Sequence, residues 1–127
     1  MNENKYKLAE GEYRFAEVVW KHEPVNSTQL VKLCENALGW KKATTYTVLR
    51  KLCERGILQN DAAIVTALVK REQVLRYETE ALLERSFDNS LPMFVAAFLQ
   101  DRRLSAREAE ELKRMIDASL EQPGDDL

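Results

Sequence analysis

The sequence predicts a mainly α-helical protein with one short β-hairpin, organised as an N-terminal domain over residues 1–69 and a helical region over residues 70–127. Three observations favour this fold class. Apolar residues recur at spacings of three and four over most of the chain, and a stretch rich in β-branched residues interrupts that pattern at residues 57–69. The 127 residues fit one domain with an appended element, and a content of 45% hydrophobic and 31% charged residues is typical of a folded globular chain.

Two amphipathic helices are expected first. One covers residues 8–23, with Glu12 placed to reach back to the amide at its start. The next covers residues 25–39, where Asn26 can cap the N-terminus and Gly39 can supply the left-handed residue that commonly ends a helix.

A third helix is expected at about residues 42–55. A rotation of 100° per residue places four of its side chains on one face, which we expect to be core: Thr45, Val48, Leu49 and Leu52. Two short strands, residues 57–61 and 64–69, then form the hairpin. Helix, helix, helix and hairpin in this order predict a winged helix-turn-helix domain, with the third helix in the recognition position.

Three further helices are expected at residues 71–87, 90–103 and 104–122. The run MFVAAFL at residues 93–99 is apolar on all sides, and a helix of that kind must be covered all round. Burial against a second copy of the chain is the economical solution, and folding back onto the N-terminal domain is the alternative. The residues expected to support a homodimer are Val74, Tyr77, Leu82, Phe94, Phe98, Leu112, Met115 and Ile116.

Positive charge is concentrated in the third helix, although the formal net charge of the chain is −2. Residues 41–55 carry five Lys or Arg and one acid, whereas residues 56–127 carry nine and fourteen. A local basic face next to hydroxyl side chains is typical of a helix that binds double-stranded DNA in the major groove. The side chains predicted to contact DNA are Lys41, Lys42, Thr44, Tyr46, Thr47, Arg50 and Lys51.

Other classes of function find little support in the sequence. His22 is the sole histidine, and no phosphate-binding loop, nucleophile elbow or Cys/His metal spacing occurs, so we expect neither an enzyme nor a cofactor. Cys34 and Cys53 fit buried helix positions better than a disulfide or redox pair. The longest apolar run is far below the roughly 20 residues that cross a bilayer, and no signal peptide is recognisable, so a cytoplasmic location without membrane insertion is expected.

Three motifs occur along the chain: L-x-x-x-E-Y-x-x-x-x-V-V-W at residues 8–20, Pro24-Val25, and W-x-x-x-T-x-x-T-V-L-x-K-L-x-x-R-G-I-L at residues 40–58. With these motifs, most of the chain resembles the BlaI/MecI/CopY family, the penicillinase repressors. This resemblance implies a dimeric transcriptional repressor, connected with β-lactam resistance, that occupies a pseudo-palindromic operator.

The resemblance also implies how the repressor is released. In the family, a membrane-bound sensor metalloprotease triggers cleavage in the C-terminal region, at a position that corresponds to Ala97-Phe98. This chain has Ala97 where the family has Asn, lacks the Cys-x-Cys pairs of the copper-responsive branch, and has a wing about four residues shorter than usual.

Two rival functions remain open at this stage. A winged helix can serve as a protein-interaction module, which the short acidic wing would suit, and a cavity near Phe94 and Phe98 would suit a ligand-responsive regulator that needs no proteolysis.

Overall fold

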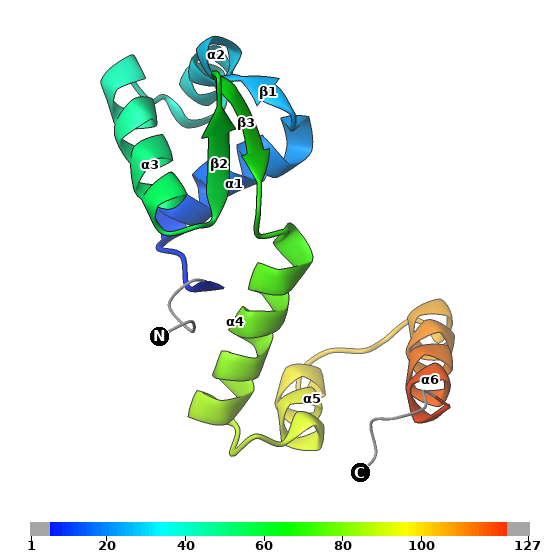
Figure 1. Ribbon diagram of the computed structural model, residues 1–127. Coiled ribbons are helices and arrows are strands. Elements are labelled where there is room, and N and C mark those ends of the chain that lie inside the picture. The colour runs from blue at the N-terminus through cyan, green and yellow to red at the C-terminus, as the bar shows by residue number, and fades with distance from the viewer. Residues whose placement is uncertain (1–5, 122–127) are drawn as a thin grey trace. The chain divides into compact units, whose positions relative to one another are not determined.

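The computed structural model describes residues 6–121 and divides the chain into two compact units, Met1–Leu82 and Leu83–Leu127 (Figure 1). The fold is mainly helical with one small antiparallel sheet, which confirms the predicted fold class. The predicted domain boundary between residues 69 and 70 lies just before a helix, and the first unit continues along that helix to Leu82.

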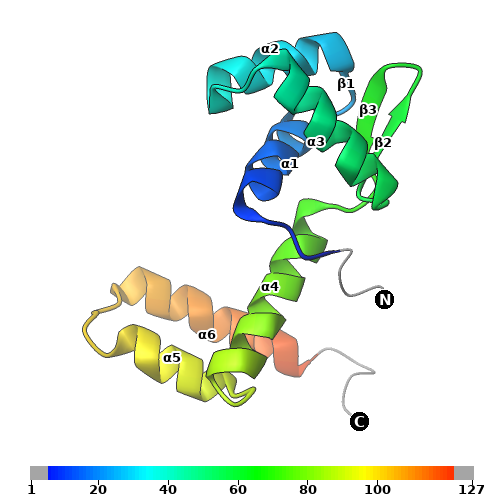
Figure 2. The ribbon, with the colours of Figure 1, turned by 90° about the vertical axis from the view of Figure 1, so that its left-hand side faces the viewer.

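The first unit begins with three helices and three strands in the order of a winged helix (Figures 1 and 2). These elements are α1 (Glu10–His22), β1 (Val25–Asn26), α2 (Ser27–Leu38), α3 (Lys42–Glu54), β2 (Leu58–Asp61) and β3 (Ile64–Ala67).

Local chemistry sets the ends of these helices as the sequence predicted. The Glu12 carboxylate accepts a hydrogen bond from the Ala9 amide at 2.9 Å, and the Asn26 side chain accepts one from the Thr28 amide at 2.8 Å. Both bonds satisfy amide groups that the first turn of a helix leaves without a partner. Gly39 ends α2 with φ 72°, a backbone conformation that glycine adopts without strain.

The sheet contains one strand more than the predicted hairpin. Its order is β1-β3-β2, all antiparallel, and Val25 of β1 pairs with Val65 of β3. Two residues are too few to show an alternating pattern in the sequence, so β1 is recognisable only from its partner. The loop between β2 and β3 consists of Ala62 and Ala63 alone, and both have positive φ, at 52° and 72°.

The core of the first unit lies between the three helices and the sheet. Phe15, Leu30, Leu52, Ile57 and Val65 are each 0% exposed. Burial of side chains of this size stabilises a fold by about 1.5 to 3 kcal/mol each, so these five residues outweigh any single polar contact in the unit.

The two tryptophans of the repressor-like motifs hold helices in place around this core. Trp40, in the turn before α3, stacks on Phe15 of α1 with ring centroids 5.7 Å apart. The Trp20 indole N–H donates to the Val69 carbonyl oxygen at 3.0 Å, which ties α1 to the chain that follows β3. The start of α3 is thereby fixed against α1 by a ring contact.

The remaining helices are α4 (Arg71–Ser86), α5 (Leu91–Leu99) and α6 (Ala106–Leu120). The Ser90 and Ser105 hydroxyls cap α5 and α6, since they accept from the Met93 and Glu108 amides at 3.1 and 3.0 Å. We expected α5 to run to residue 103, but it ends at Leu99, where an Arg102 amide bond to the Leu99 carbonyl turns the chain.

Candidate nucleic-acid interface

The two faces of α3 differ as the helical rotation predicted. Thr45, Leu49 and Leu52 are buried and Val48 is half-buried. Of the side chains predicted to contact DNA, six are exposed and only Tyr46 is half-buried. The exposed set is Lys41, Lys42, Thr44, Thr47, Arg50 and Lys51. One helix therefore presents hydroxyl, guanidinium and ammonium groups to solvent while its opposite face is anchored in the core.

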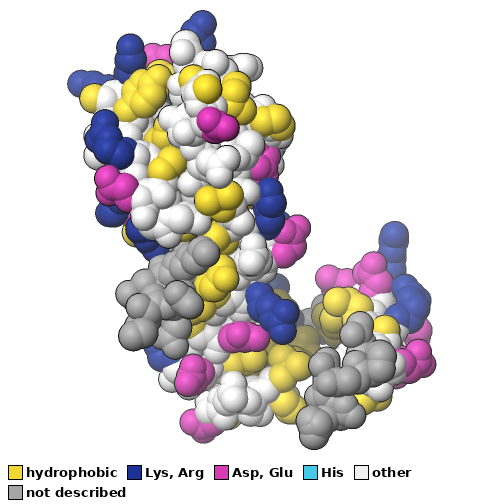
Figure 3. Space-filling view, in the orientation of Figure 1, with side chains coloured by type: hydrophobic (Ala, Val, Ile, Leu, Met, Phe, Trp, Pro, Cys, Tyr) yellow, Lys and Arg dark blue, Asp and Glu magenta, His cyan; other side chains and the backbone are white. Residues whose placement is uncertain are grey.

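The space-filling view places this charge on the surface. Lys and Arg side chains gather along the edge of the first unit over α3, at the left in Figure 3. Such a row of cations on one helix is the electrostatic footprint of a phosphate-binding face.

Tyr46 links α3 to the start of α2. Its hydroxyl lies 3.4 Å from the Ser27 Oγ, a long hydrogen bond. Its ring also lines a surface depression together with Arg50, Cys53 and Asn60 of β2. Tyr46 thus has a packing role in addition to the predicted contact with DNA.

A group of charged side chains that sequence reasoning did not assign connects α1 to the end of α3. Glu12 forms ion pairs with Lys51 and with Arg55, each at 3.1 Å. Burial acts to raise the pKa of the Glu12 carboxyl, but the Ala9 amide and the Lys51 and Arg55 cations outweigh burial and lower that pKa below its ordinary value. The signal was present in the sequence, because Glu12 and Arg55 belong to the two repressor-like motifs.

The wing offers no positive charge. Residues 57–69 contain no Lys or Arg, and Asp61 is exposed at the end of β2. Ile64 and Leu68 are 41% and 52% exposed. The wing therefore offers no cationic side chain for contact with phosphates.

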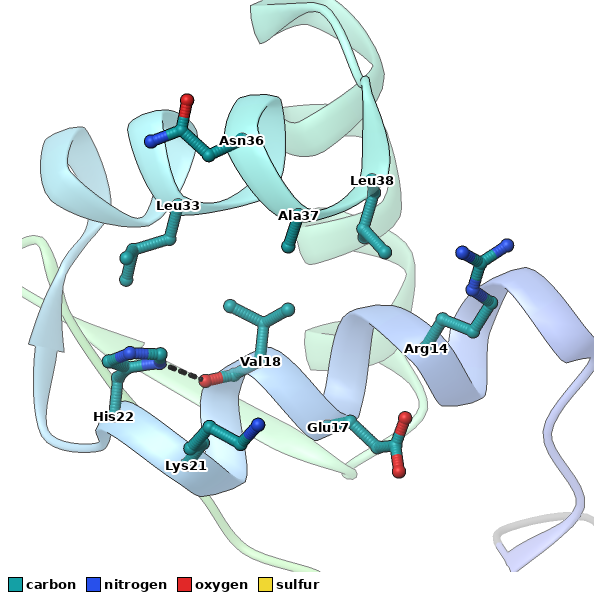
Figure 4. Close-up of a pocket in the computed structure, with 9 residues that line it drawn as sticks. All are labelled: Arg14, Glu17, Val18, Lys21, His22, Leu33, Asn36, Ala37 and Leu38. Carbon is teal, nitrogen blue, oxygen red and sulfur yellow. Dashed lines mark hydrogen bonds between the residues drawn. The ribbon is translucent and has the colours of Figure 1, made fainter.

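A groove of about 440 Å³ runs between α1 and α2 (Figure 4). Val18, Leu33 and Ala37 point into it, whereas Asn36 points away. The His22 ring is hydrogen-bonded to the Val18 carbonyl oxygen at 2.9 Å. Ligand sites usually bring several polar groups together around an apolar floor. This groove is lined by neither Phe94 nor Phe98, so the ligand-responsive alternative, which needs a cavity near those two residues, stays a prediction.

Both cysteines are free thiols. Burial raises the pKa of Cys34 to about 11, against a smaller opposing contribution from Thr45, and burial also raises the pKa of Cys53. Among residues 6–121, no group of three or more His, Cys, Asp or Glu side chains could hold a metal ion, and no helix is long and apolar enough to cross a membrane.

The residues predicted for dimerisation fall into two groups. Val74 is 0% exposed and belongs to the core of the first unit, so the fold of a single chain already buries it. Tyr77 is half-buried and contacts Tyr6 with ring centroids 6.4 Å apart, and Leu82 is half-buried as well.

The second unit, in contrast, exposes its apolar side chains. No residue of α5 or α6 is buried. Phe94 is half-buried between Phe87 and Phe98, and Phe98 is 50% exposed beneath the Arg102 guanidinium. Large exposed apolar side chains on these helices are Leu91, Met93, Val95, Phe98, Leu112, Met115, Ile116 and Leu120.

Comparison with known proteins finds relatives along most of the chain. A sequence model of the penicillinase repressor family matches residues 8–118. The penicillinase repressor of Bacillus licheniformis is 23% identical over 115 residues, which cover 87% of this chain and 90% of that protein. The match spans both units.

Proposed function

The chain belongs to the penicillinase repressor family of DNA-binding transcriptional repressors, and on that premise we propose that it acts as a dimer on a pseudo-palindromic operator. In this proposal α3 of each protomer enters the major groove of one half-site, with half-sites about 10 base pairs apart centre to centre. The observation that supports it most is the division of α3 into a buried face and an exposed face with hydroxyl and cationic groups. A role in β-lactam resistance follows from the function for which the family is named.

The exposed residues would divide the work by their chemistry. A guanidinium can bond the O6 and N7 atoms of guanine together, so Arg50 is the residue proposed to select a base pair. Lys41 and Lys42 lie at the start of α3, where an ammonium suits phosphates. Thr44 and Thr47 carry both a hydroxyl and a methyl group, which can bond a phosphate or touch a thymine methyl.

Parallel titrations of the operator and of a scrambled duplex test this division. Arg50→Ala should weaken operator binding by about 1 to 3 kcal/mol and relax the preference at one base pair. Lys42→Ala should weaken binding to both duplexes alike. It should also reduce the slope of log K against log salt by about 1. If both variants lose the same affinity for both duplexes, the assignment of roles is rejected. If the affinity of the wild type does not depend on salt, the proposed DNA-binding face is rejected as well.

A homodimer is proposed from the second unit. Helices whose apolar side chains remain exposed need a further surface to cover them, and a second copy of the same helices is self-complementary by symmetry. Ile116 and Met115 are 61% and 64% exposed, so they are available to a partner without any change within the unit.

The oligomeric state can be measured directly by sedimentation. Ile116→Glu should shift the protein towards the monomer and weaken operator binding, because a dimer binds two half-sites at once. Arg114→Glu places the same side chain on the opposite side of α6 and serves as the control. If Ile116→Glu sediments like the wild type at every concentration, Ile116 is not part of the interface.

As the mode of release we propose cleavage between Ala97 and Phe98, triggered by a membrane-bound sensor metalloprotease. Both residues are exposed on α5, and a cut there would divide the apolar surface proposed for the dimer. Mass spectrometry of the repressor from induced and uninduced cells tests this step. An intact chain in induced cells whose operator is free would mean release without proteolysis.

A further inference from the structure

One carboxylate of α1 lies against the cationic end of α3. The Glu12 Oε2 atom is 3.1 Å from the Lys51 ammonium, and its Oε1 atom is 3.1 Å from the Arg55 guanidinium. The Ala9 amide also donates to Oε1, at 2.9 Å. The Glu12 side chain is 12% exposed, whereas the Lys51 side chain is 62% exposed. The carboxylate is thus held in place from several sides, and Lys51 is the partner that solvent can reach.

Arg55 and Lys51 differ in how firmly they are bound. The Arg55 side chain is 27% exposed, and its Nη2 atom donates to the Lys7 carbonyl oxygen as well, at 2.6 Å. No second contact is shown for Lys51 in the part of the chain that the structure describes. Of the two cations, Lys51 is therefore the one whose availability to a phosphate depends on its ion pair with Glu12.

Lys51 also lies in line with the face proposed for DNA. It follows Thr44 by seven residues, close to two turns of a helix, so both side chains occupy the same side of α3. A DNA phosphate near that side would compete with Glu12 for the ammonium group. The fixed carboxylate has the advantage, because it is already in contact and is shielded from water.

We infer that Glu12 withholds Lys51 from DNA, so that the lysine adds nothing to phosphate binding in the wild-type repressor. Glu12 is then a positioning residue that limits the non-specific grip of α3 and leaves recognition to Thr44, Thr47 and Arg50. The inference rests on the proposed function, and it revises the prediction that Lys51 itself contacts DNA. Each lysine that neutralises a phosphate releases counterions, so withholding one makes binding less dependent on salt.

The experiment measures how the affinity for duplex DNA falls with salt in four variants. Glu12→Gln keeps the shape and hydrogen-bonding oxygen of the side chain but frees Lys51, so the slope of log K against log salt should steepen by about 0.9 per protomer. That change corresponds to a roughly threefold greater loss of affinity per protomer between 50 and 200 mM salt. Lys51→Met alone should leave the slope of the wild type unchanged. In the double variant Glu12→Gln/Lys51→Met the added slope should vanish.

Glu10→Gln is the matched control, because it removes the same charge from an exposed position in the same first turn of α1. Its slope should stay close to that of the wild type. If Glu10→Gln steepens the slope as much as Glu12→Gln, the effect is one of net charge and the inference fails. It also fails if Glu12→Gln weakens binding with an unchanged slope, since a purely structural role would do that.

Two further results keep the test decisive. Should Glu12→Gln prove unfolded by circular dichroism, Lys51→Met still tests the inference, because a shallower slope than wild type would show that Lys51 reaches DNA with Glu12 present. A wild-type protein that binds no duplex at all would overturn the proposed function, and the inference with it. If the wild-type protein binds DNA but Glu12→Gln shows the same salt slope, the inference fails and the proposed function stands.

Discussion

The tip of the wing offers a direct test of the backbone geometry. Ala62 and Ala63 form a two-residue loop between β2 and β3, and both lie in the left-handed region, with φ of 52° and 72°. Two-residue hairpin loops of this kind favour Asn-Gly, because an alanine Cβ approaches the following carbonyl oxygen when φ is positive. We therefore predict that Ala62→Asn/Ala63→Gly is more stable than the wild type.

The expected gain follows from two opposing effects. A residue with a Cβ in the left-handed region costs roughly 1 to 2 kcal/mol, which glycine removes at position 63 and asparagine reduces at position 62. Glycine also raises the conformational entropy of the unfolded chain. This effect lowers the free energy of unfolding by roughly 0.4 to 1 kcal/mol and offsets part of the gain. The double variant should gain about 1 kcal/mol in the free energy of unfolding, or roughly 4 °C in Tm.

Urea unfolding at one fixed protein concentration measures this gain, since any dimer would make stability depend on concentration. Ala62→Val is the control and should lose about 1 kcal/mol, because a β-branched residue tolerates positive φ poorly. DNA affinity should not change, as the wing has no Lys or Arg. A double variant no more stable than the wild type, or undiminished stability in Ala62→Val, would contradict the loop geometry.

Three other predictions follow from buried and charged groups. In residues 6–121, the Thr45 hydroxyl is the one buried side-chain oxygen or nitrogen without a well-formed hydrogen bond, and the Cys34 thiol beside it is a weak partner. Thr45→Val removes this poorly satisfied hydroxyl. It should therefore raise the free energy of unfolding, measured by urea titration, by about 1 kcal/mol. A loss of stability in Thr45→Val would mean that a strong partner exists. The pKa of Cys34 is about 11 in the fold against an ordinary 9.0, so stability should be complete below pH 9 and fall as pH rises towards 11. Cys34→Ala should remove the loss of stability between pH 9 and pH 11. Chemical labelling of the native protein at pH 7 should be slow at both thiols. The pKa of Glu12 is lowered from an ordinary 4.5, so its contribution should be present above pH 4.5 and disappear below it, and Glu12→Gln should flatten that acid-side loss.

Much of the candidate interface could be predicted from the sequence because its causes are local. The helical period alone separated Thr45, Leu49 and Leu52 from the exposed Arg50 and Thr47, and the structure places them on opposite faces of α3. Helix ends were equally accessible, since the caps at Asn26 and Ser105 involve groups within three residues of each other. The family, too, was recognisable from motifs that the match over residues 8–118 confirms.

Contacts between distant residues could not be read in the same way. β1 is two residues long and is a strand only because Val25 pairs with Val65, forty residues later in the chain. No local sequence pattern predicts that pairing. Val74 is expected from the sequence to support a homodimer, yet the core of the first unit buries it completely. The helical period predicts which side of α3 Lys51 occupies, but it cannot show that Lys51 forms an ion pair with Glu12 of α1.

The sequence by itself determined the helices, their caps, the recognition position of α3 and the concentration of positive charge on it, because each of these depends on residues close together in the chain. Only the tertiary structure decided which of those charges are already bound. Glu12 lies 39 residues before Lys51 and 43 before Arg55, and packing of α1 against α3 brings the Glu12 carboxylate to 3.1 Å from each of the two cations. Charge on a helix is set by composition, but its availability is set by what the fold places opposite it.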